Sequence, residues 1–200
     1  MNKNALIIFV RNPILGKVKT RLAATIGNKK ALEVYVHLLQ HTKNITALTT
    51  ATKFVFYADY INDNDVWNGY EKRLQSGNDL GERMQHAFED LFAAGYKSIC
   101  IIGSDCYELT NEIIEEAFLK LQSVHVVIGP VSDGGYYLLG CNTFIPDFFS
   151  NKQWSTTTVF ADTIADVTKL SLSVQQLPLL NDIDEEKDLS NSSMAYLLDK

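Results

Sequence analysis

Short, mainly apolar runs bounded by charged or turn-forming residues recur along the chain. They lie at residues 5–10, 54–57, 98–102 and 124–128. Runs of this length are typical of strands buried on both faces of a sheet. Residues 73–75 and 172–177 are weaker strand candidates.

Between these runs, apolar positions follow helical spacing. They predict helices over about residues 28–48, from Asp79 onward, from Thr110 onward, near 157–168 and after Asp184. Asp79 and Thr110 are residue types that cap helix N-termini, and an acid three residues after Asp79 completes a capping pattern. Because strands alternate with helices, we expect a three-layer α/β/α Rossmann-like fold with a mostly parallel sheet. With no repeat or linker, residues 1–200 are interpreted as one domain.

Composition adds few constraints on function. Apolar residues form 46% of the chain and charged residues 21%, as is ordinary for globular proteins. No apolar run approaches the roughly 20 residues that a membrane span needs, so no span is expected. The three cysteines show no paired spacing, which favours buried packing roles and a reduced, cytoplasmic setting.

Charge is distributed unevenly along the chain. The net charge is −6, which argues against a nucleic-acid partner. The first 32 residues nevertheless contain seven Lys or Arg and no acid, whereas the remainder contains eleven basic and 24 acidic residues. A concentrated basic segment on an acidic protein favours a site for a small anion, the alternative being a solvated charged face.

The basic segment after the first predicted strand has the composition of a phosphate-binding loop. Gly16 allows close approach of the backbone, and cationic side chains come from Arg11, Lys17, Lys19 and Arg21. The loop is not of the Walker type, which needs Gly at position 11 and Ser or Thr at position 18. The dinucleotide pattern G-x-G-x-x-G is also missing, which counts against an NAD enzyme.

Acidic residues follow several of the later predicted elements. Asp105 comes after the strand at 98–102, Asp133 comes after the strand at 124–128, and Asp182 and Asp184 lie near the C-terminus. Ligands of open α/β sheets bind beyond the carboxyl ends of the strands, and Mg²⁺ commonly combines one or two carboxylates with substrate phosphates. These acids therefore predict a metal site, although Asp133 could be only a turn residue and Asp182 and Asp184 could cap a helix.

Taken together and in order, six segments resemble those of one bacterial family. They are RNPILGKVKTRL (11–22), QSGNDLGERM (75–84), IGSDC (102–106), GPVSDGGYYL (129–138), WST (154–156) and DIDEEKDL (182–189). The family comprises GT-A-like transferases of the nucleotide-diphospho-sugar transferase superfamily, related to 2-phospho-lactate guanylyltransferases and molybdenum cofactor nucleotidyltransferases. The chain departs from it at Tyr107, where relatives usually have Pro, so a bulkier turn adjoins Asp105.

The resemblance implies a role for each matching residue. The nucleotide phosphates would bind the loop, and Gln75 and Gly77 would contact the base. Asp105 would be the metal ligand on the nucleotide side, with Asp182 or Asp184 completing a Mg²⁺ or Mn²⁺ site. Lys19 and Asp133 would be catalytic, Asp133 on the acceptor side.

Three functions are compatible with these residues. The first is nucleotidyl transfer from a nucleoside triphosphate to a small phosphorylated or sugar-like acceptor, which the dense basic loop favours. The second is glycosyl transfer from a nucleotide-sugar. The third is nucleotide binding without catalysis, which only Tyr107 encourages.

Overall fold

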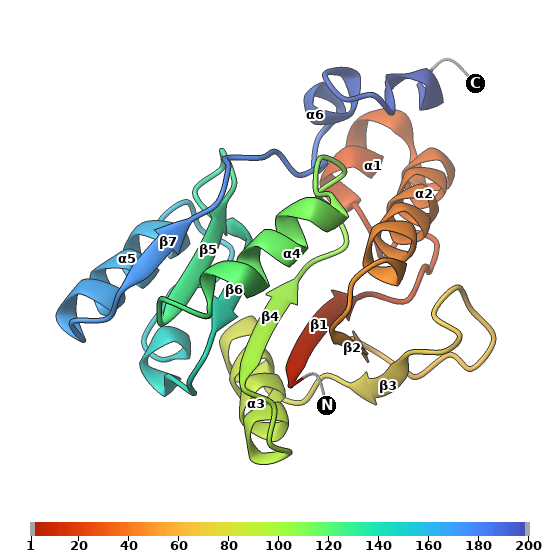
Figure 1. Ribbon diagram of the computed structural model, residues 1–200. Helices are drawn as coiled ribbons and strands as arrows, with labels where there is room; N and C mark the ends of the chain where they lie inside the picture. The colour runs from red at the N-terminus through yellow and green to blue at the C-terminus, as the bar shows by residue number, and fades with distance from the viewer. Residues whose placement is uncertain (1–2, 199–200) are drawn as a thin grey trace.

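A seven-stranded sheet forms the middle layer of the computed structural model, which describes residues 3–198 (Figure 1). Its strands are β1 (Asn4–Val10), β2 (Thr52–Tyr57), β3 (Glu71–Leu74), β4 (Ser98–Ile102), β5 (Val126–Pro130), β6 (Tyr136–Cys141) and β7 (Val174–Gln176). The spatial order is β3-β2-β1-β4-β6-β5-β7. Only the two pairings that involve β6 are antiparallel.

Helices cover both faces of the sheet. They are α1 (Thr20–Ile26), α2 (Asn28–Ala47), α3 (Leu80–Ala93), α4 (Asn111–Lys120), α5 (Val159–Lys169) and α6 (Glu186–Ser190), with short 3-10 helices at Pro146–Phe149 and Ala195–Leu197. On one face, α2 and α4 bury Leu39 and Phe118 in the same core as Ile8. On the other face, α3 and α5 pack against residues such as Ile7. The expected three-layer α/β/α fold is confirmed.

Among the strands and α-helices, β6 and α1 were not expected from the sequence. Strand β6 follows β5 through a tight turn, in which the Gly134 N–H donates to the Val131 carbonyl at 3.1 Å. The turn is so short that the apolar residues of β6 did not stand out as a separate strand. Helix α1 was also missed, because it has only seven residues and ends at Gly27, whose φ of 83° and ψ of 155° separate it from α2.

A third apolar cluster attaches the C-terminal part of the chain to α1 and α2. Its buried members are Leu22, Ala31, Val34, Leu38, Ile183, Leu189, Met194 and Leu197. Figure 1 shows α6 lying beside α1 and far from β7, the strand that precedes α6 in the sequence. This packing brings the residues just before α6 to the carboxyl end of β1 and β4.

The helices of residues 3–198 include none that is both long and apolar enough to cross a membrane. Cys100, Cys106 and Cys141 are buried free thiols, as packing roles require.

Candidate functional site

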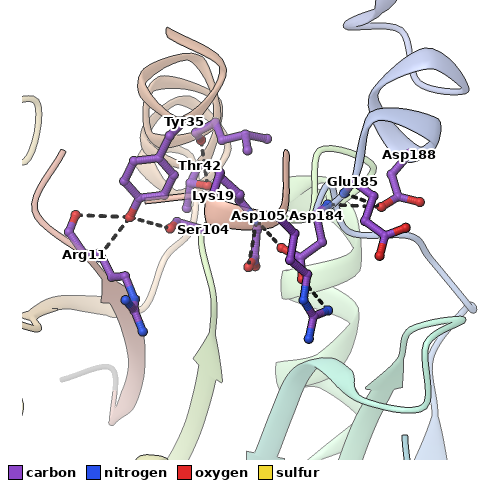
Figure 2. Close-up of polar contacts among 11 residues, drawn as sticks. Arg11, Lys19, Tyr35, Thr42, Ser104, Asp105, Asp184, Glu185 and Asp188 are labelled. Atoms are coloured by element: carbon purple, nitrogen blue, oxygen red, sulfur yellow. Dashed lines mark hydrogen bonds and ion pairs between the residues drawn. The ribbon is translucent and has the colours of Figure 1, made fainter. Parts of the chain in front are cut away.

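Lys19 is the centre of an ion-pair cluster that joins three distant segments of the chain. Its Nζ lies 3.3 Å from Oδ2 of Asp105 and 2.8 Å from Oδ1 of Asp184 (Figure 2). The Lys19 side chain is only 6% exposed, whereas those of Asp105 and Asp184 are 44% and 37% exposed. The fold therefore brings together one predicted catalytic residue and two predicted metal ligands.

The electrostatics of this cluster favour the charged forms of Lys19 and Asp184. Burial alone would lower the pKa of Lys19, but Asp105 and Asp184 outweigh that effect and raise it to about 12. Burial would raise the pKa of Asp184, yet the neighbouring Lys19 holds it below its ordinary value, with help from Arg21. At neutral pH the Lys19 ammonium thus faces the ionised carboxylate of Asp184.

Backbone geometry fixes the direction in which the Lys19 side chain leaves the main chain. Lys19 adopts the left-handed conformation (φ 45°, ψ 50°) at the start of α1. Its carbonyl accepts from the Ala23 N–H at 2.8 Å, and the preceding Val18 is buried. Since a non-glycine residue rarely has a positive φ, this conformation is maintained by the surrounding contacts.

The other cations of the basic loop lie at the surface. Arg21 is 66% exposed and places Nη1 3.7 Å from Asp184. Lys17 and Arg11 are exposed, and Gly16 has the positive φ of 76° that the turn requires. Arg11 is held by its backbone: its N–H donates to the Tyr35 hydroxyl at 2.9 Å, and its carbonyl accepts from the same group at 3.1 Å (Figure 2). Arg11, Lys17 and Arg21 are therefore accessible to an anion, whereas Lys19 is buried.

Asp105 is positioned by the turn at the end of β4. A Cβ on Gly103 would lie 2.8 Å from Oδ1 of Asp105, so only glycine leaves room for the carboxylate in this position. The Asp105 carbonyl accepts from the Ile183 N–H at 3.0 Å. This hydrogen bond ties the end of β4 to the segment that carries Asp182 and Asp184.

Asp182 and Asp133 come together because their segments pair. Val131 forms a parallel bridge with Leu180, and Ser132 Oγ donates to Asn181 at 2.7 Å. The pKa of Asp182 is raised to about 7, first by burial and then by the charges of Asp105, Asp133 and Asp184, with Lys19 opposing. All four predicted acidic residues therefore contribute to one negative region.

Two of the alternative explanations for these acids can be examined directly. Helix α6 is capped by Glu185 in a capping box with Asp188, so the expectation that Asp182 or Asp184 caps it is wrong (Figure 2). Asp133 does have a turn role, because its Oδ1 accepts from the Gly135 N–H at 2.9 Å. That contact does not preclude a second role for the carboxylate.

Gln75 and Gly77 make structural contacts at the same edge of the sheet. The Gln75 side-chain amide donates to the carbonyls of Phe56 at 2.9 Å and Val10 at 3.3 Å. A Cβ on Gly77 would lie 2.7 Å from Cβ of Glu82, so the loop packs tightly against the first turn of α3. Their predicted contact with a base stays a prediction.

The burial of Asn12 and the packing of Tyr107 were not predicted from the sequence. Asn12 is 1% exposed, and its side chain donates to the Tyr60 carbonyl at 2.9 Å. Tyr107 lies against His41, with ring centroids 4.4 Å apart, which explains how the bulkier turn is accommodated. An Asn-Pro pair predicts a turn, but no local pattern indicates that the Asn side chain is buried.

The residues of the cluster suit a hard divalent cation. Among residues 3–198, no three or more His, Cys, Asp and Glu side chains form a group that could hold a metal by themselves. Asp105 and Asp184 nevertheless present partly exposed carboxylates, and the pKa of Asp182 is raised first by burial and then by the charges of the neighbouring acids. Such a set fits Mg²⁺ or Mn²⁺, which bind through few protein carboxylates and complete their shell with phosphates and water.

The comparisons with known proteins agree with this architecture. A sequence profile of the family described as "Uncharacterized protein conserved in bacteria (DUF2064)" matches residues 40–156. The chain belongs to the DUF2064 family. The matched part of the DUF2064 chain contains Asp105 and Asp133, whereas Lys19 and Asp184 lie outside it. A search of curated proteins gave no match.

A solved structure from Desulfovibrio desulfuricans G20, described as a candidate nucleotide-diphospho-sugar transferase, is 34% identical. The match covers 100% of the DUF2064 chain and 95% of that protein, with a TM-score of 0.90. The 4-diphosphocytidyl-2C-methyl-D-erythritol synthase of Anaerococcus prevotii is 10% identical at a TM-score of 0.64, covering 97% and 95% of the two chains. The inositol-1-phosphate CTP transferase of T. maritima is 10% identical at a TM-score of 0.58, and the match covers 98% of the DUF2064 chain and 95% of that protein. At 10% identity, the latter two show only that the chain shares their fold.

Proposed function

We propose that this protein is a metal-dependent transferase that takes a nucleotide donor. The observation that carries the proposal is the convergence of Lys19, Asp105 and Asp184 beside the exposed cations of the basic loop. Carboxylates next to accessible cations, at the carboxyl edge of a mostly parallel sheet, suit a metal–phosphate complex. Asp105 with Asp184 or Asp182 would hold Mg²⁺ or Mn²⁺.

Each group of residues has a defined task in this proposal. Lys17, Lys19 and Arg21 bind the donor phosphates, and Arg11 adds positive charge at the start of the loop. The metal, when bound, neutralises charge that develops on the phosphates. Phosphoryl-group chemistry needs mainly such positioning and neutralisation, so no covalent nucleophile is required. Asp133 orients or deprotonates the acceptor.

We favour nucleotidyl transfer from a nucleoside triphosphate to a small phosphorylated or sugar-like acceptor. A triphosphate carries more charge than a diphosphate, and the loop offers four cationic side chains within residues 11–21. A relationship to the 2-phospho-lactate guanylyltransferases, and hence a phosphorylated acceptor, is part of this proposal.

Glycosyl transfer is the second candidate. It is favoured by the 34% identical relative, which is described as a candidate nucleotide-diphospho-sugar transferase. The same metal and phosphate groups would serve a nucleotide-sugar, so the product distinguishes the two reactions.

The test is a donor screen with the purified protein, Mg²⁺ and pooled small phosphorylated compounds and sugars as acceptors. Nucleotidyl transfer predicts release of pyrophosphate from one nucleoside triphosphate. Release of a nucleoside diphosphate from a nucleotide-sugar would instead establish glycosyl transfer. Binding of donors with turnover of neither would support a nucleotide-binding protein without catalysis.

A further inference from the structure

The ammonium group of Lys19 lies between the two carboxylates that the proposed function assigns to the metal. It contacts one oxygen of Asp105 and one oxygen of Asp184, at 3.3 and 2.8 Å. The ammonium therefore bridges the pair in the manner of a small cation, while the side chain that carries it is almost fully buried.

A divalent cation cannot share this position with the ammonium. Ligands of Mg²⁺ lie at about 2.0–2.1 Å from the metal, and Nζ lies 2.8 Å from Oδ1 of Asp184, so a metal on the same oxygens would lie within about 5 Å of Nζ. Repulsion between a double and a single positive charge at that distance is strong in a partly buried site, where water screens it weakly. Binding of one cation therefore weakens the binding of the other.

The local structure allows the side chain to move while the backbone stays. Val18 is buried, and the Lys19 carbonyl is hydrogen-bonded to Ala23 as part of α1, so the main chain is fixed on both sides. The Lys19 side chain, by contrast, is held at its end by the two ion pairs. The two acids are 44% and 37% exposed, so the end of the buried Lys19 side chain lies next to solvent, on the side from which another cation would approach.

We propose that Lys19 is a displaceable counter-ion: the metal and the Lys19 ammonium compete for Asp105 and Asp184, and metal binding releases Lys19 toward the donor phosphates. This inference rests on the proposed function, and adds a binding order to it. A phosphate group that arrives with the metal offers the released ammonium a new partner. Metal and nucleotide then bind with positive coupling through one side chain.

The first experiment measures Mn²⁺ affinity without nucleotide, by calorimetry and by the electron paramagnetic resonance of free Mn²⁺. Lys19→Met, which keeps an unbranched apolar stem and removes the competing charge, is expected to bind Mn²⁺ about tenfold more tightly than the parent protein. Arg21→Met is the matched control, because it removes a positive charge near Asp184 from an exposed side chain. The Mn²⁺ affinity of Arg21→Met should exceed that of the parent protein by no more than about threefold, because the charge of an exposed side chain is well screened.

A second experiment uses the unmodified protein and does not depend on a variant folding. Lysine acylation is followed over time by mass spectrometry, with exposed Lys17 as the internal reference. Lys19 should react slowly alone and several-fold faster when Mn²⁺ is saturating. An unchanged Lys19 rate, or equal Mn²⁺ affinities for Lys19→Met and Arg21→Met, would overturn the competition.

Asp105→Asn separates this inference from the proposed function. If Asp105→Asn loses Mn²⁺ binding while Lys19→Met binds Mn²⁺ no more tightly than the parent protein, the metal site is supported. Competition between the metal and the Lys19 ammonium is then wrong. If Asp105→Asn binds Mn²⁺ like the parent protein, or if no variant binds it, the assigned metal site fails and the inference fails with it.

Discussion

Nζ of Lys19 lies 2.8 Å from a carboxylate oxygen of Asp184, although 165 positions separate the two residues in the sequence. The contact depends on the packing of the C-terminal apolar cluster against α1 and α2, which carries Asp184 across the end of the sheet. The site is thus assembled from segments near both ends of the sequence. Most of the strands and helices that form the core lie between these segments in the sequence.

The basic loop predicts a localised effect of charge on nucleotide affinity. Lys17→Ala, Lys19→Ala and Arg21→Ala should each weaken nucleotide binding by about 1–3 kcal/mol, the range for charge-assisted hydrogen bonds. Lys97→Ala is the control, because this exposed lysine precedes β4 at the opposite edge of the sheet. Titration calorimetry with one nucleoside triphosphate measures the nucleotide affinity of all four variants. Equal losses at Lys97 and in the loop would place the nucleotide elsewhere.

The raised pKa of Asp182 predicts a pH dependence of stability. The pKa is about 7 in the folded protein against 3.8 for the unperturbed side chain, so between these values the folded state holds a proton that the unfolded state has lost. This contribution to stability is therefore present at low pH and is lost as the pH rises toward 7. Asp182→Asn removes the carboxyl group that titrates. Stability should therefore decline less steeply in this variant as the pH rises toward 7.

Thermal unfolding at a series of pH values from 4 to 8, in the presence of chelator, measures that slope. Below about pH 4 a loss of stability is expected in both proteins, because Asp184 has a lowered pKa and loses its pairing with Lys19 when protonated. Parallel curves for parent and variant across pH 4–7 would show that Asp182 titrates normally.

Gly134 should be intolerant of substitution for reasons of packing. It has a φ of 92°, and a Cβ there would lie 2.0 Å from the Thr157 carbonyl oxygen. Gly134→Ala is expected to destabilise the protein by more than the roughly 1–2 kcal/mol that a left-handed conformation alone costs a side chain. Gly69→Ala isolates that smaller cost, because Gly69 has a φ of 86° and nothing within 4 Å of its Cβ position. Similar denaturant midpoints for the two variants would contradict the clash.

Asp133→Asn distinguishes catalysis from turn formation. Asn can accept the same hydrogen bond from the Gly135 N–H, so the turn and the stability should be preserved. If Asp133 acts on the acceptor, turnover should fall while nucleotide affinity stays nearly unchanged. Affinity and turnover should be measured side by side, once a donor and an acceptor are identified. Unaltered turnover would remove Asp133 from the catalytic residues, and lost affinity would make it a donor-side residue.

Much of the fold follows from local patterns in the sequence. The uninterrupted apolar runs of β1 and β4 identify central strands, and Asp79 and Thr110 do cap α3 and α4 through their side chains. Strand β6 escaped prediction because it follows β5 after a short turn, and its pairing with β4 is decided by residues distant in the sequence. No periodicity within residues 136–141 encodes that choice of partner.

The candidate site was predictable in its residues, and less so in its contacts. Asp105 and the basic loop follow strands, so their meeting at one edge could be inferred from topology. The ion pairs of Lys19 could not, because they require the path of the chain from β7 to α6. The buried Asn12 and the contact of Tyr107 with His41 likewise depend on tertiary packing.

The central claim is that Asp105 and its neighbours bind a nucleotide together with a metal. Titration calorimetry with a nucleoside triphosphate, in Mg²⁺ and in excess chelator, tests it most directly when the parent protein and Asp105→Asn are compared. The account predicts binding that is at least about tenfold tighter with Mg²⁺ in the parent, and no such dependence in a folded Asp105→Asn. Equal affinity in Mg²⁺ and chelator for the parent protein would contradict it.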